Sequence, residues 1–593
     1  MIKLSEYVTQ FLVDNGVSCA FGVSGGASIH LLHSISENSS IKLICPHHEQ
    51  SGAMAADGYA RSSGKLGVAV ATSGPGATNM ITGICCSYYD SVPVLYLTGQ
   101  VSTFRAVGNT GVRQVGFQET PITEMVSPIT KYCVKIKNPA EIKYELQKAI
   151  HIAKSGRPGP VLIDIPDNFQ RTMVEPEGLV EYSPSSIEKI TEGFSNEKLK
   201  LIQMAIKKSK RPVIIAGWGL NLAGVQESFR QFSTGLNIPV ACTWGASNIL
   251  SDNKTLNLGT FGTHGTRSAN FAVQNADLII SLGSRLDTKA TGTPVNTFAR
   301  EAIKVMVDID ENELGKFRHF DLTMDLLVHA DLAEFFSRFE TNNISDLRDD
   351  YENWFAQVKA WKELEKSVDS QIAQTQEINP YNFFEKFSGS LSSASKIFID
   401  TGCSIAWAMQ AANFKEMHSV FHDFNNTAMG WALPASIGSH AEYPLIDHYC
   451  IVGDGAFMMT MQELATVRHH NLPLKIFLIN NGGYSMIKQT QEQWLESKHI
   501  ASGLKDISFP SFEKVAKSFG FRYLELSETK EIDNTLNKVV TMTDPVFVNL
   551  IISPDARVIP QVKFGRANED MEPLLSREQF HKAMIIPSLP SSD

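Results

Sequence analysis

Two glycine-rich polar turns constrain the fold of this chain more than any other feature. A short apolar run at 449–452 leads into Gly453-Asp454-Gly455, and a helical pattern follows over 461–470. A second apolar run at 474–479 then ends at Asn480-Asn481, about 27 residues after the aspartate. This order predicts strand, turn, helix and strand, with polar residues at the carboxyl ends of two parallel strands. That edge of an open α/β sheet is where ligands bind.

These turns have the chemistry of a magnesium site beside a phosphate. A carboxylate and a carboxamide from neighbouring strand ends are hard oxygen ligands, and Mg²⁺ usually keeps positions free for phosphate oxygens. The glycines allow backbone amides to approach a phosphate, and the start of the following helix favours negative charge. A Gly-Asp-Gly sequence alone is more often an ordinary turn. The asparagine pair after the next strand makes the site the better interpretation.

The pairing of Gly-Asp-Gly with Asn-Asn after the next strand is the signature of thiamine-diphosphate enzymes. The segment resembles the acetohydroxyacid (acetolactate) synthase branch of that family, including 462–466 (Gln-Glu-Leu-Ala-Thr) within the helix. The resemblance implies that Asp454, the Asn481 side chain and the Gly483 carbonyl bind Mg²⁺, which anchors the diphosphate of the cofactor. It also implies cofactor contacts at Gly402, Thr427, Gly453, Gly455 and Ala456.

A second group of motifs lies near the amino terminus. Ser-Gly-Gly-Ala at 24–27, Pro46-His47-His48-Glu49-Gln50 and 72–79 (Thr-Ser-Gly-Pro-Gly-Ala-Thr-Asn) each follow a short predicted strand. An isolated Glu49 would be read as a partly buried acid at a helix start, stabilised by the helix dipole. Together, however, the motifs resemble the pyrimidine-binding domain of acetohydroxyacid synthases. The resemblance implies cofactor contacts at Gly26, Ala27, Pro75 and Asn79.

The same resemblance assigns three catalytic residues. Glu49 is implied to exchange a proton with the aminopyrimidine ring of the cofactor and so to activate its thiazolium carbon, a role that burial promotes. Gln118, in the segment 117–121, is implied to line the active site. Met429 would on general grounds be a core residue. In the matching segment of the family it supports the bent cofactor, and we prefer that role.

These motifs fit a chain of three domains. Short apolar runs bounded by glycine turns alternate with helical patterns, which predicts an α/β fold of doubly wound parallel sheets. As in the thiamine-diphosphate enzyme fold, we expect a pyrimidine-binding domain at 1–175, a middle domain at 195–340 and a diphosphate-binding domain at 375–560. The remaining residues, 561–593, read as an irregular, proline-containing tail.

The middle domain carries a nucleotide-binding pattern. Predicted strands run into glycine turns, and one ends in an aspartate, as ribose-binding strands commonly do. A degenerate domain without a cofactor is the alternative. With 262–266 (Gly-Thr-His-Gly-Thr), the domain resembles the FAD-binding middle domain of acetohydroxyacid synthases, in which the flavin has a largely structural role. The implied FAD contacts are Gly217, Gly219, Thr243, His264, Gly283, Arg285, Asp308 and Asp331.

Four features depart from the family pattern. Thr490 stands where the family usually has a Trp that selects the second 2-keto acid, and Lys289 replaces an Arg that meets the carboxylate of the acceptor. Arg and Lys are not equivalent at such a site. Ile405-Ala406 replaces a Gln-His pair near the diphosphate. The segment 100–117 is about six residues longer than usual, which is also typical of a simple surface-loop insertion.

These departures decide the expected function. The residues implied to act on the donor are intact, whereas those implied to select the acceptor are not. We therefore expect a carboligase that decarboxylates pyruvate and transfers the two-carbon unit to a carbonyl acceptor, a ketone such as a nucleotide-linked keto-deoxysugar. The alternative is an acetolactate synthase that uses a second pyruvate or 2-ketobutyrate. A non-catalytic binding protein is least favoured, because Glu49 and Asp454 are both present.

Bulk properties exclude other classes. At 593 residues the chain is too long for one core, and a net charge of -10 argues against nucleic-acid binding. Eight scattered cysteines without a C-x-x-C pair predict a reduced, cytoplasmic protein rather than a zinc site. No apolar run reaches about 18 residues and no signal-peptide core is visible, so no membrane span is expected. The resemblance implies a homodimer or homotetramer with its active site between chains.

Overall fold

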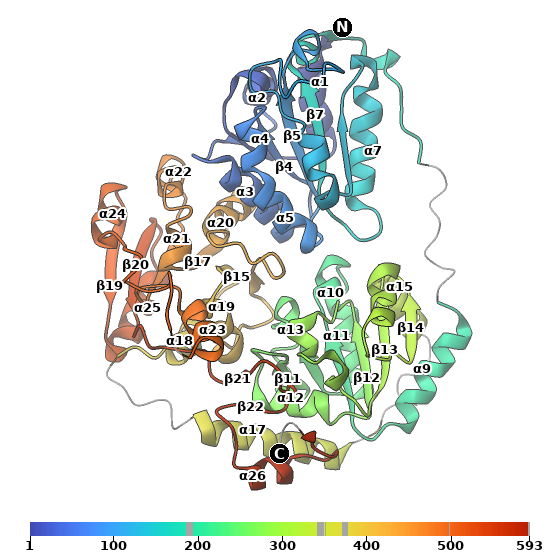
Figure 1. Cartoon of the computed structure of the whole chain (residues 1–593), viewed down its shortest axis with the longest axis vertical. Coiled ribbons are helices and arrows are strands. Elements are labelled where there is room, and N and C mark those ends of the chain that lie inside the picture. Colours follow the sequence, from blue (N-terminus) through green and yellow to red (C-terminus); the bar gives the residue numbers. More distant parts are fainter. Residues whose placement is uncertain (185–193, 341–348, 350, 370–376, 497, 591–593) are drawn as a thin grey trace.

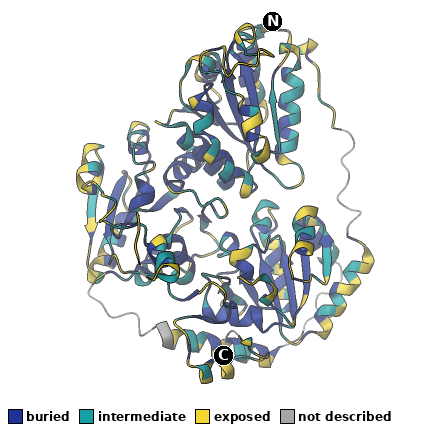
Figure 2. Cartoon of the chain, viewed as in Figure 1, coloured by how far each residue is buried: buried dark blue, intermediate teal, exposed yellow. Residues whose placement is uncertain are grey.

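Three parallel sheets of six strands each organise the chain (Figure 1), which confirms the predicted α/β class. In the view of Figure 1 the first sheet lies at the top, the third at the left and the middle one at the lower right. Figure 2 shows that their strands are mostly buried. The computed structural model describes residues 1–593 except 185–193, 341–348, 350, 370–376, 497 and 591–593.

The first sheet has the strand order β3-β2-β4-β5-β7-β6. Its strands are β2 (Cys19–Gly22), β3 (Lys42–Ile44), β4 (Gly67–Ala71), β5 (Val94–Gln100), β6 (Tyr132–Lys135) and β7 (Val161–Pro166). The accompanying helices are α1 (Leu4–Asp14), α2 (Ile29–Glu37), α3 (Glu49–Ser63), α4 (Pro75–Asn79), α5 (Ile81–Tyr89), α6 (Ile122–Val126), α7 (Ile142–Lys154) and α8 (Asp167–Gln170). A short antiparallel pair, β1 (Ile2–Lys3) and β8 (Met173–Val174), joins the two ends of this region.

The middle sheet has the order β11-β10-β9-β12-β13-β14. Its strands are β9 (Pro212–Ala216), β10 (Val240–Cys242), β11 (Asn257–Thr260), β12 (Leu278–Leu282), β13 (Ile303–Asp308) and β14 (Leu326–His329). The helices are α9 (Asn196–Lys208), α10 (Gly219–Leu222), α11 (Gln226–Leu236), α12 (Arg267–Gln274), α13 (Thr288–Thr291), α14 (Glu311–Gly315) and α15 (Leu332–Glu340).

The third sheet has the order β16-β15-β17-β18-β20-β19. Its strands are β15 (Ser395–Ile399), β16 (Ser419–Phe421), β17 (Asp447–Gly453), β18 (Lys475–Asn480), β19 (Arg522–Leu526) and β20 (Val546–Ile551). The helices are α18 (Pro380–Ser390), α19 (Cys403–Ala411), α20 (Ala432–Glu442), α21 (Asp454–Phe457), α22 (Glu463–His469), α23 (Ser485–Trp494), α24 (Phe512–Ser518) and α25 (Ile532–Val540).

In each sheet there is one point at which the strand order reverses: earlier strands lie on one side of it and later strands on the other. The change falls between β2 and β4 in the first sheet, between β9 and β12 in the middle sheet, and between β15 and β17 in the third. The first and third sheets therefore share one topology. Ligands of open α/β sheets bind at this point, beyond the carboxyl ends of the strands. The predicted glycine turns after β2, β4, β9, β12, β15 and β17 lie at these points.

Helices α3 and α20 pack against each other and join the first and third sheets. The approach requires glycine at two positions. A Cβ on Gly58 would lie 2.3 Å from the carbonyl oxygen of Ala435, and a Cβ on Gly438 would lie 1.9 Å from that of Ala55. Buried apolar residues of both regions form one continuous core around this contact.

The C-terminal tail is more ordered than its sequence predicts. It contains the antiparallel pair β21 (Gln561–Val562) and β22 (Met571–Glu572), followed by α26 (Arg577–Ala583). Helix α17 (Glu352–Asp369) lies beside α26 in Figure 1, and the indole nitrogen of Trp361 donates to the carbonyl of Ala583 at 2.9 Å. The tail has no regular apolar pattern that would predict these elements. It is ordered because residues such as Leu575 and Phe580 pack into the core of the middle domain. The domain boundaries themselves stay a prediction.

Among the described helices, none is both long and apolar enough for a membrane crossing.

Candidate active site

Asp454 joins the carboxyl ends of β17 and β18 into one turn. Its Oδ2 accepts hydrogen bonds from the backbone amides of Asn481 (3.1 Å), Gly482 (2.7 Å) and Gly483 (3.1 Å). Its Oδ1 accepts one from the amide of Gly455 at 2.7 Å. Burial raises the pKa of Asp454 to about 6, and these four amides oppose the rise. The carboxylate is thereby fixed at the edge of the sheet.

The same turn offers ligands that fit a hard divalent cation. The side-chain oxygen of Asn481 is buried and has no hydrogen-bond partner within the described residues. A buried acceptor without a donor is rare and needs an explanation. Together with the neighbouring carboxylate it fits Mg²⁺. Gly402 and Gly453 face open space, because a Cβ on either would meet nothing within 4 Å. That space suits a phosphate group.

A cavity of about 550 Å³ opens at this edge. It brings together every site residue predicted in the third domain: Gly402, Thr427, Met429, Gly453, Asp454, Gly455, Ala456, Asn481 and Gly483. Three of the residues that depart from the family pattern, Lys289, Ile405 and Thr490, line it as well. Lys563, Phe564 and Arg566 of the tail also line it, and they were not predicted because no motif marks them.

The site residues predicted in the first domain form a separate group. The side-chain amide of Asn79 donates to Glu49 Oε2 at 2.9 Å, and a Cβ on Gly76 would lie 3.2 Å from Glu49 Oε1. A Cβ on Gly74 would lie 2.9 Å from the carbonyl oxygen of Gln118, so this loop packs directly against that residue. Glu49 therefore sits between the segment 74–79 and the end of β3.

The glycine loop after β2 completes this group. The backbone amide of Ala27 donates to the hydroxyl of Thr72 at 3.1 Å, which brings Gly26 and Ala27 beside the loop that carries Pro75. Glu49 is only partly buried, and Pro75 is exposed. All the described residues that line the 550 Å³ cavity come from position 244 onward. Within one chain, the two groups of predicted cofactor residues thus form two half-sites.

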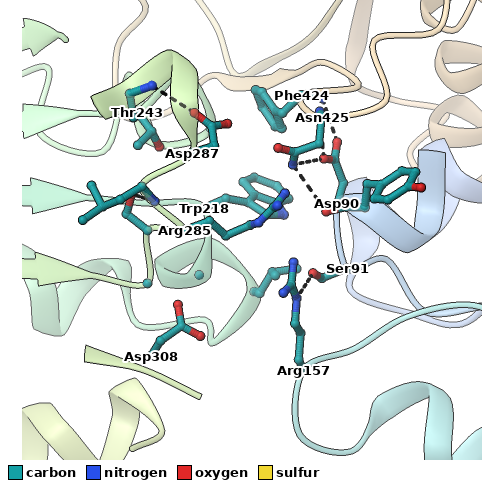
Figure 3. A pocket seen from close by; sticks show the side chains of 18 of the residues that line it. Asp90, Ser91, Arg157, Trp218, Thr243, Arg285, Asp287, Asp308, Phe424 and Asn425 are labelled. Atoms are coloured by element: carbon teal, nitrogen blue, oxygen red, sulfur yellow. Dashed lines mark hydrogen bonds between the residues drawn. The ribbon is translucent and has the colours of Figure 1, made fainter. Parts of the chain in front are cut away.

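A second cavity, of about 410 Å³, lies between the three regions (Figure 3). It is lined by seven of the predicted flavin contacts: Gly219, Thr243, His264, Gly283, Arg285, Asp308 and Asp331. Gly217 is not among the lining residues. A Cβ there would lie 2.2 Å from the carbonyl oxygen of Gly283, so this glycine allows two turns to approach each other.

Electrostatics in the smaller cavity follow from burial. Burial lowers the pKa of His264 to about 4, so its imidazole is neutral near pH 7, and raises that of Asp308 to about 6. Arg285 pairs with Glu313 at 2.8 Å. Two buried ring nitrogens on the wall, Trp218 Nε1 and His264 Nδ1, have no hydrogen-bond partner in the described part of the chain. They fit a planar ligand that carries polar ring atoms.

The walls that the other two regions contribute to this cavity carry no sequence motif. Asp90 and Arg157 come from the first region, and Phe424 and Asn425 from the third (Figure 3). No local pattern could have identified them, because each side chain reaches the cavity only through the packing of the three sheets. Lys289 lines both cavities and lies 5.5 Å from the ring centroid of Trp244. The two cavities are therefore neighbours.

Comparison with known protein families matches all three regions. Residues 2–125 match the family described as thiamine pyrophosphate enzyme, N-terminal TPP binding domain. Residues 199–338 match its central domain, and residues 400–550 match its C-terminal TPP binding domain.

Curated relatives match the chain over nearly its full length. An acetolactate synthase large subunit of Lactococcus lactis subsp. lactis is 34% identical over 572 residues, covering 96% of this chain and 95% of the relative. That of Corynebacterium glutamicum is 32% identical, covering 97% and 91%. A probable acetolactate synthase large subunit of Methanocaldococcus jannaschii is 31% identical, covering 98% and 97%.

Proposed function

Because this chain belongs to the thiamine-diphosphate-dependent acetolactate synthase family, we propose that it converts pyruvate to acetolactate. It would decarboxylate one pyruvate and transfer the two-carbon unit to a second pyruvate or to 2-ketobutyrate. The relatives named above favour this alternative over the ketone acceptor that we expected first. The observation that carries the proposal is the 550 Å³ cavity, in which all the predicted donor-side residues of the third domain meet.

The chain's own residues have defined tasks in this proposal. When bound, thiamine diphosphate would supply a nucleophilic carbon toward the keto group of pyruvate and a thiazolium ring that takes up the electron pair left behind when CO₂ departs. Asp454, Asn481 and the Gly483 carbonyl would hold the Mg²⁺ that binds its diphosphate. The carboxyl group of Glu49, fixed by Asn79, exchanges a proton with a ring nitrogen. Lys289 supplies the positive charge that meets the carboxylate of the acceptor.

A homodimer is the smallest active unit that we propose, and a homotetramer is compatible with it. The two half-sites of one chain do not share a cavity, and each is surrounded by exposed apolar side chains. Phe117, next to Gln118, is 85% exposed, and Phe564, on the wall of the cavity, is 68% exposed. Exposed apolar groups of this size mark interaction surfaces. In a two-fold dimer each first-domain half-site would meet the third-domain half-site of the partner.

FAD is the ligand that we propose for the 410 Å³ cavity. Its aromatic wall, its unpartnered ring nitrogens and the Asp308 at the end of a strand support a flavin nucleotide. The purified protein should be yellow and should release FAD on denaturation. A colourless enzyme that is fully active and unaffected by added FAD would contradict this assignment.

Product analysis tests the proposed reaction. The protein is incubated with pyruvate, thiamine diphosphate and Mg²⁺, and the products are separated by chromatography. We expect acetolactate from pyruvate alone, and a second acetohydroxy acid when 2-ketobutyrate is added. If pyruvate is consumed only in the presence of a bulky ketone or a keto-deoxysugar nucleotide, the protein is the ketone-using carboligase that we expected first. No consumption under any condition would exclude both.

A further inference from the structure

The segment 424–432, called the Met429 segment below, is held in place by buried carboxylates on both sides of Met429. Asp423 accepts a hydrogen bond from the amide just before Met429 at 2.8 Å. Asp400 accepts one from the amide just after it at 3.0 Å. Between these bonds Thr427 has a φ of 53°, a left-handed value that is unfavourable for a β-branched residue. Such a conformation persists only where its surroundings enforce it.

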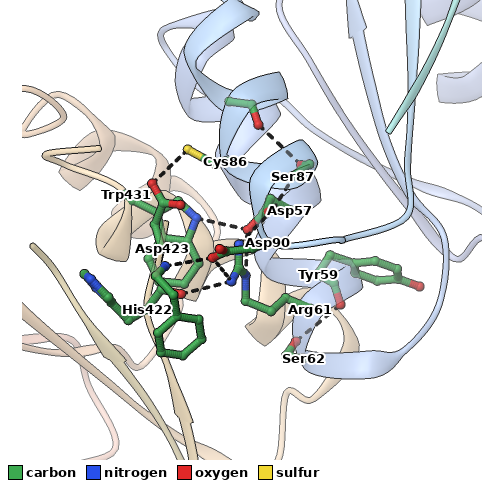
Figure 4. A network of polar contacts seen from close by, with 12 residues as sticks. Asp57, Tyr59, Arg61, Ser62, Cys86, Ser87, Asp90, His422, Asp423 and Trp431 are labelled. Atoms are coloured by element: carbon green, nitrogen blue, oxygen red, sulfur yellow. Dashed lines mark hydrogen bonds and ion pairs between the residues drawn. The ribbon is translucent and has the colours of Figure 1, made fainter. Parts of the chain in front are cut away.

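A third carboxylate reaches the Met429 segment from the first domain (Figure 4). Asp90 accepts hydrogen bonds from the backbone amides of Phe424 at 2.7 Å and Asn425 at 3.1 Å. It also accepts a hydrogen bond from the side-chain amide of Asn425 at 2.5 Å and pairs with the guanidinium group of Arg61, which lies 2.6 Å away. Arg61 also pairs with Asp57 at 3.0 Å, and the side chains of all three residues are fully buried. Asp90 thus binds the beginning of the segment.

The same Arg61 network binds the end of the segment. The indole nitrogen of Trp431 donates to Asp57 Oδ1 at 3.0 Å, and the guanidinium carbon of Arg61 lies 5.0 Å from the centre of its ring (Figure 4). A buried ion pair that loses one partner leaves an uncompensated charge, which is strongly unfavourable. The contacts from α3 and the end of α5 therefore clamp both ends of the segment on which Thr427 and Met429 lie.

We propose that Asp90 and Arg61 are positioning residues for the Met429 segment of their own chain. The inference rests on the proposed function, in which Glu49 of the same domain acts at the cavity of the partner chain. Each first domain then serves two sites: it supplies Glu49 to one and shapes the wall of the other. Asp90 also lines the 410 Å³ cavity, so one carboxylate lines that cavity and holds the segment that lines the 550 Å³ cavity.

Cofactor affinity tests the positioning role without depending on turnover. Asp90→Asn keeps the shape of the side chain and removes its charge, so the two amides lose a charge-assisted acceptor. At saturating Mg²⁺ we expect the Kd of thiamine diphosphate to rise about tenfold, the size of one lost hydrogen bond to a charged group. Arg61→Lys keeps the charge but not the two-pronged geometry, and should act in the same direction.

Asp277→Asn is the matched control. Asp277 accepts hydrogen bonds from two successive backbone amides, those of Lys210 (2.8 Å) and Arg211 (2.9 Å), and lines neither cavity. Its loss should leave the Kd of thiamine diphosphate within about twofold of that of the parent protein. Unchanged affinity in folded Asp90→Asn and Arg61→Lys proteins would overturn the proposal. So would an equal loss of affinity in the control.

Mixed dimers show on which chain Asp90 acts. An Asp90→Asn chain and a Glu49→Gln chain are co-expressed with different affinity tags, and the mixed dimers are isolated. If Asp90 acts on its own chain, one of the two sites combines an intact Glu49 with an intact Met429 segment. The mixed dimer should then have about half of the parent activity. The assay contains thiamine diphosphate at about the Kd of the parent protein, where the Asp90→Asn chain is largely unloaded. If Asp90 acts on the partner, both sites are defective, and the activity is no higher than that of the Asp90→Asn protein.

A second mixed dimer separates this inference from the proposed function. Asp454→Ala replaces Asp90→Asn in it, and the result depends only on whether two chains share a site. Recovery in this dimer without recovery in the Asp90→Asn dimer would overturn the inference alone. No recovery in either would overturn the two-chain site, and with it the inference.

Discussion

At the scale of single residues, burial governs the acids around the larger cavity. Burial raises the pKa of Asp400 and Asp454 to about 6, while backbone amides draw both values down. Burial raises the pKa of Asp423 further, to about 7, and the neighbouring charge of Asp90 adds to the rise. Arg61 opposes it. Asp423 accepts hydrogen bonds from the amide of Ala428 and the Cys86 thiol through one oxygen only.

Protonation of Asp423 makes stability depend on pH. Its pKa in an unfolded chain is about 3.9, so between pH of about 4 and 7 the folded state holds a proton that the unfolded state has lost. The stabilisation is complete below pH 4 and is lost as the pH rises through about 7. Asp423→Asn lacks this titration. We expect its thermal midpoint, relative to that of the parent, to be at least about 2 °C higher at pH 8 than at pH 5.5.

Unfolding curves recorded at the two pH values check this prediction. A difference between variant and parent that is the same at pH 5.5 and pH 8 would show that Asp423 does not titrate in this window. A difference of the opposite sign would show that the carboxylate is stabilised rather than destabilised by its surroundings.

At the scale of elements, helix α23 forms the wall of the larger cavity that we propose as its acceptor side. Thr490 and Trp494 are four residues apart, on one face of the helix, and both line the cavity. The hydroxyl of Thr490 donates to the carbonyl of Met486 at 3.0 Å and is therefore satisfied within the helix. Trp494 meets Phe564 of the tail edge to face, with ring centres 6.0 Å apart. Helix and tail together shape this wall.

A larger side chain on this wall should sharpen acceptor choice. With Thr490 we expect poor discrimination between pyruvate and 2-ketobutyrate, because a small side chain leaves space for either. Thr490→Trp fills that space and should change the ratio of the two products at least about fivefold. This is below the range of about 10- to 200-fold by which an apolar pocket discriminates between ligands that differ by one methylene. Thr490→Val, which removes only the hydroxyl, should leave the ratio within about twofold. An unchanged ratio in Thr490→Trp, measured with both acceptors in competition, would exclude a role for this position.

Elements with a local pattern were predictable, and those without one were not. Apolar runs before Gly453 and Asn481 identified β17 and β18 directly, because buried parallel strands are apolar throughout. Strand β6 is only partly buried along its length, and so lacks that signature. Strands β21 and β22 have two residues each and exist through their pairing with one another.

The site shows the same limit. Asp454 and Glu49 lie in motifs. Arg61, in contrast, donates to the carbonyl of His422 and interacts with the charge of Asp423 only because α3 packs on α20. Residues separated by more than three hundred positions share no local pattern. The tail residue Phe564 reaches the cavity for the same reason. Motif chemistry was therefore readable from the sequence, while the walls of both cavities were not.

At the scale of the whole molecule, the arrangement of the first and third domains decides the assembly. They share a core through α3 and α20, yet the half-site around Glu49 and the half-site around Asp454 stay apart. A single chain thus carries both predicted halves of the cofactor site without joining them. Two copies related by a two-fold axis would form two complete sites. This two-chain site is the central claim of the proposed function.

Mixed dimers of two inactive variants test that claim most directly. Glu49→Gln removes the proton-exchanging group, which should lower activity at least about a hundredfold. Asp454→Ala removes the proposed Mg²⁺ ligand. Chains that carry one change each are co-expressed with different tags, and dimers that contain both are isolated and assayed with pyruvate. One site of every mixed dimer should be intact, which gives about half of the parent activity. Activity no higher than that of the two variants would place the complete site within a single chain.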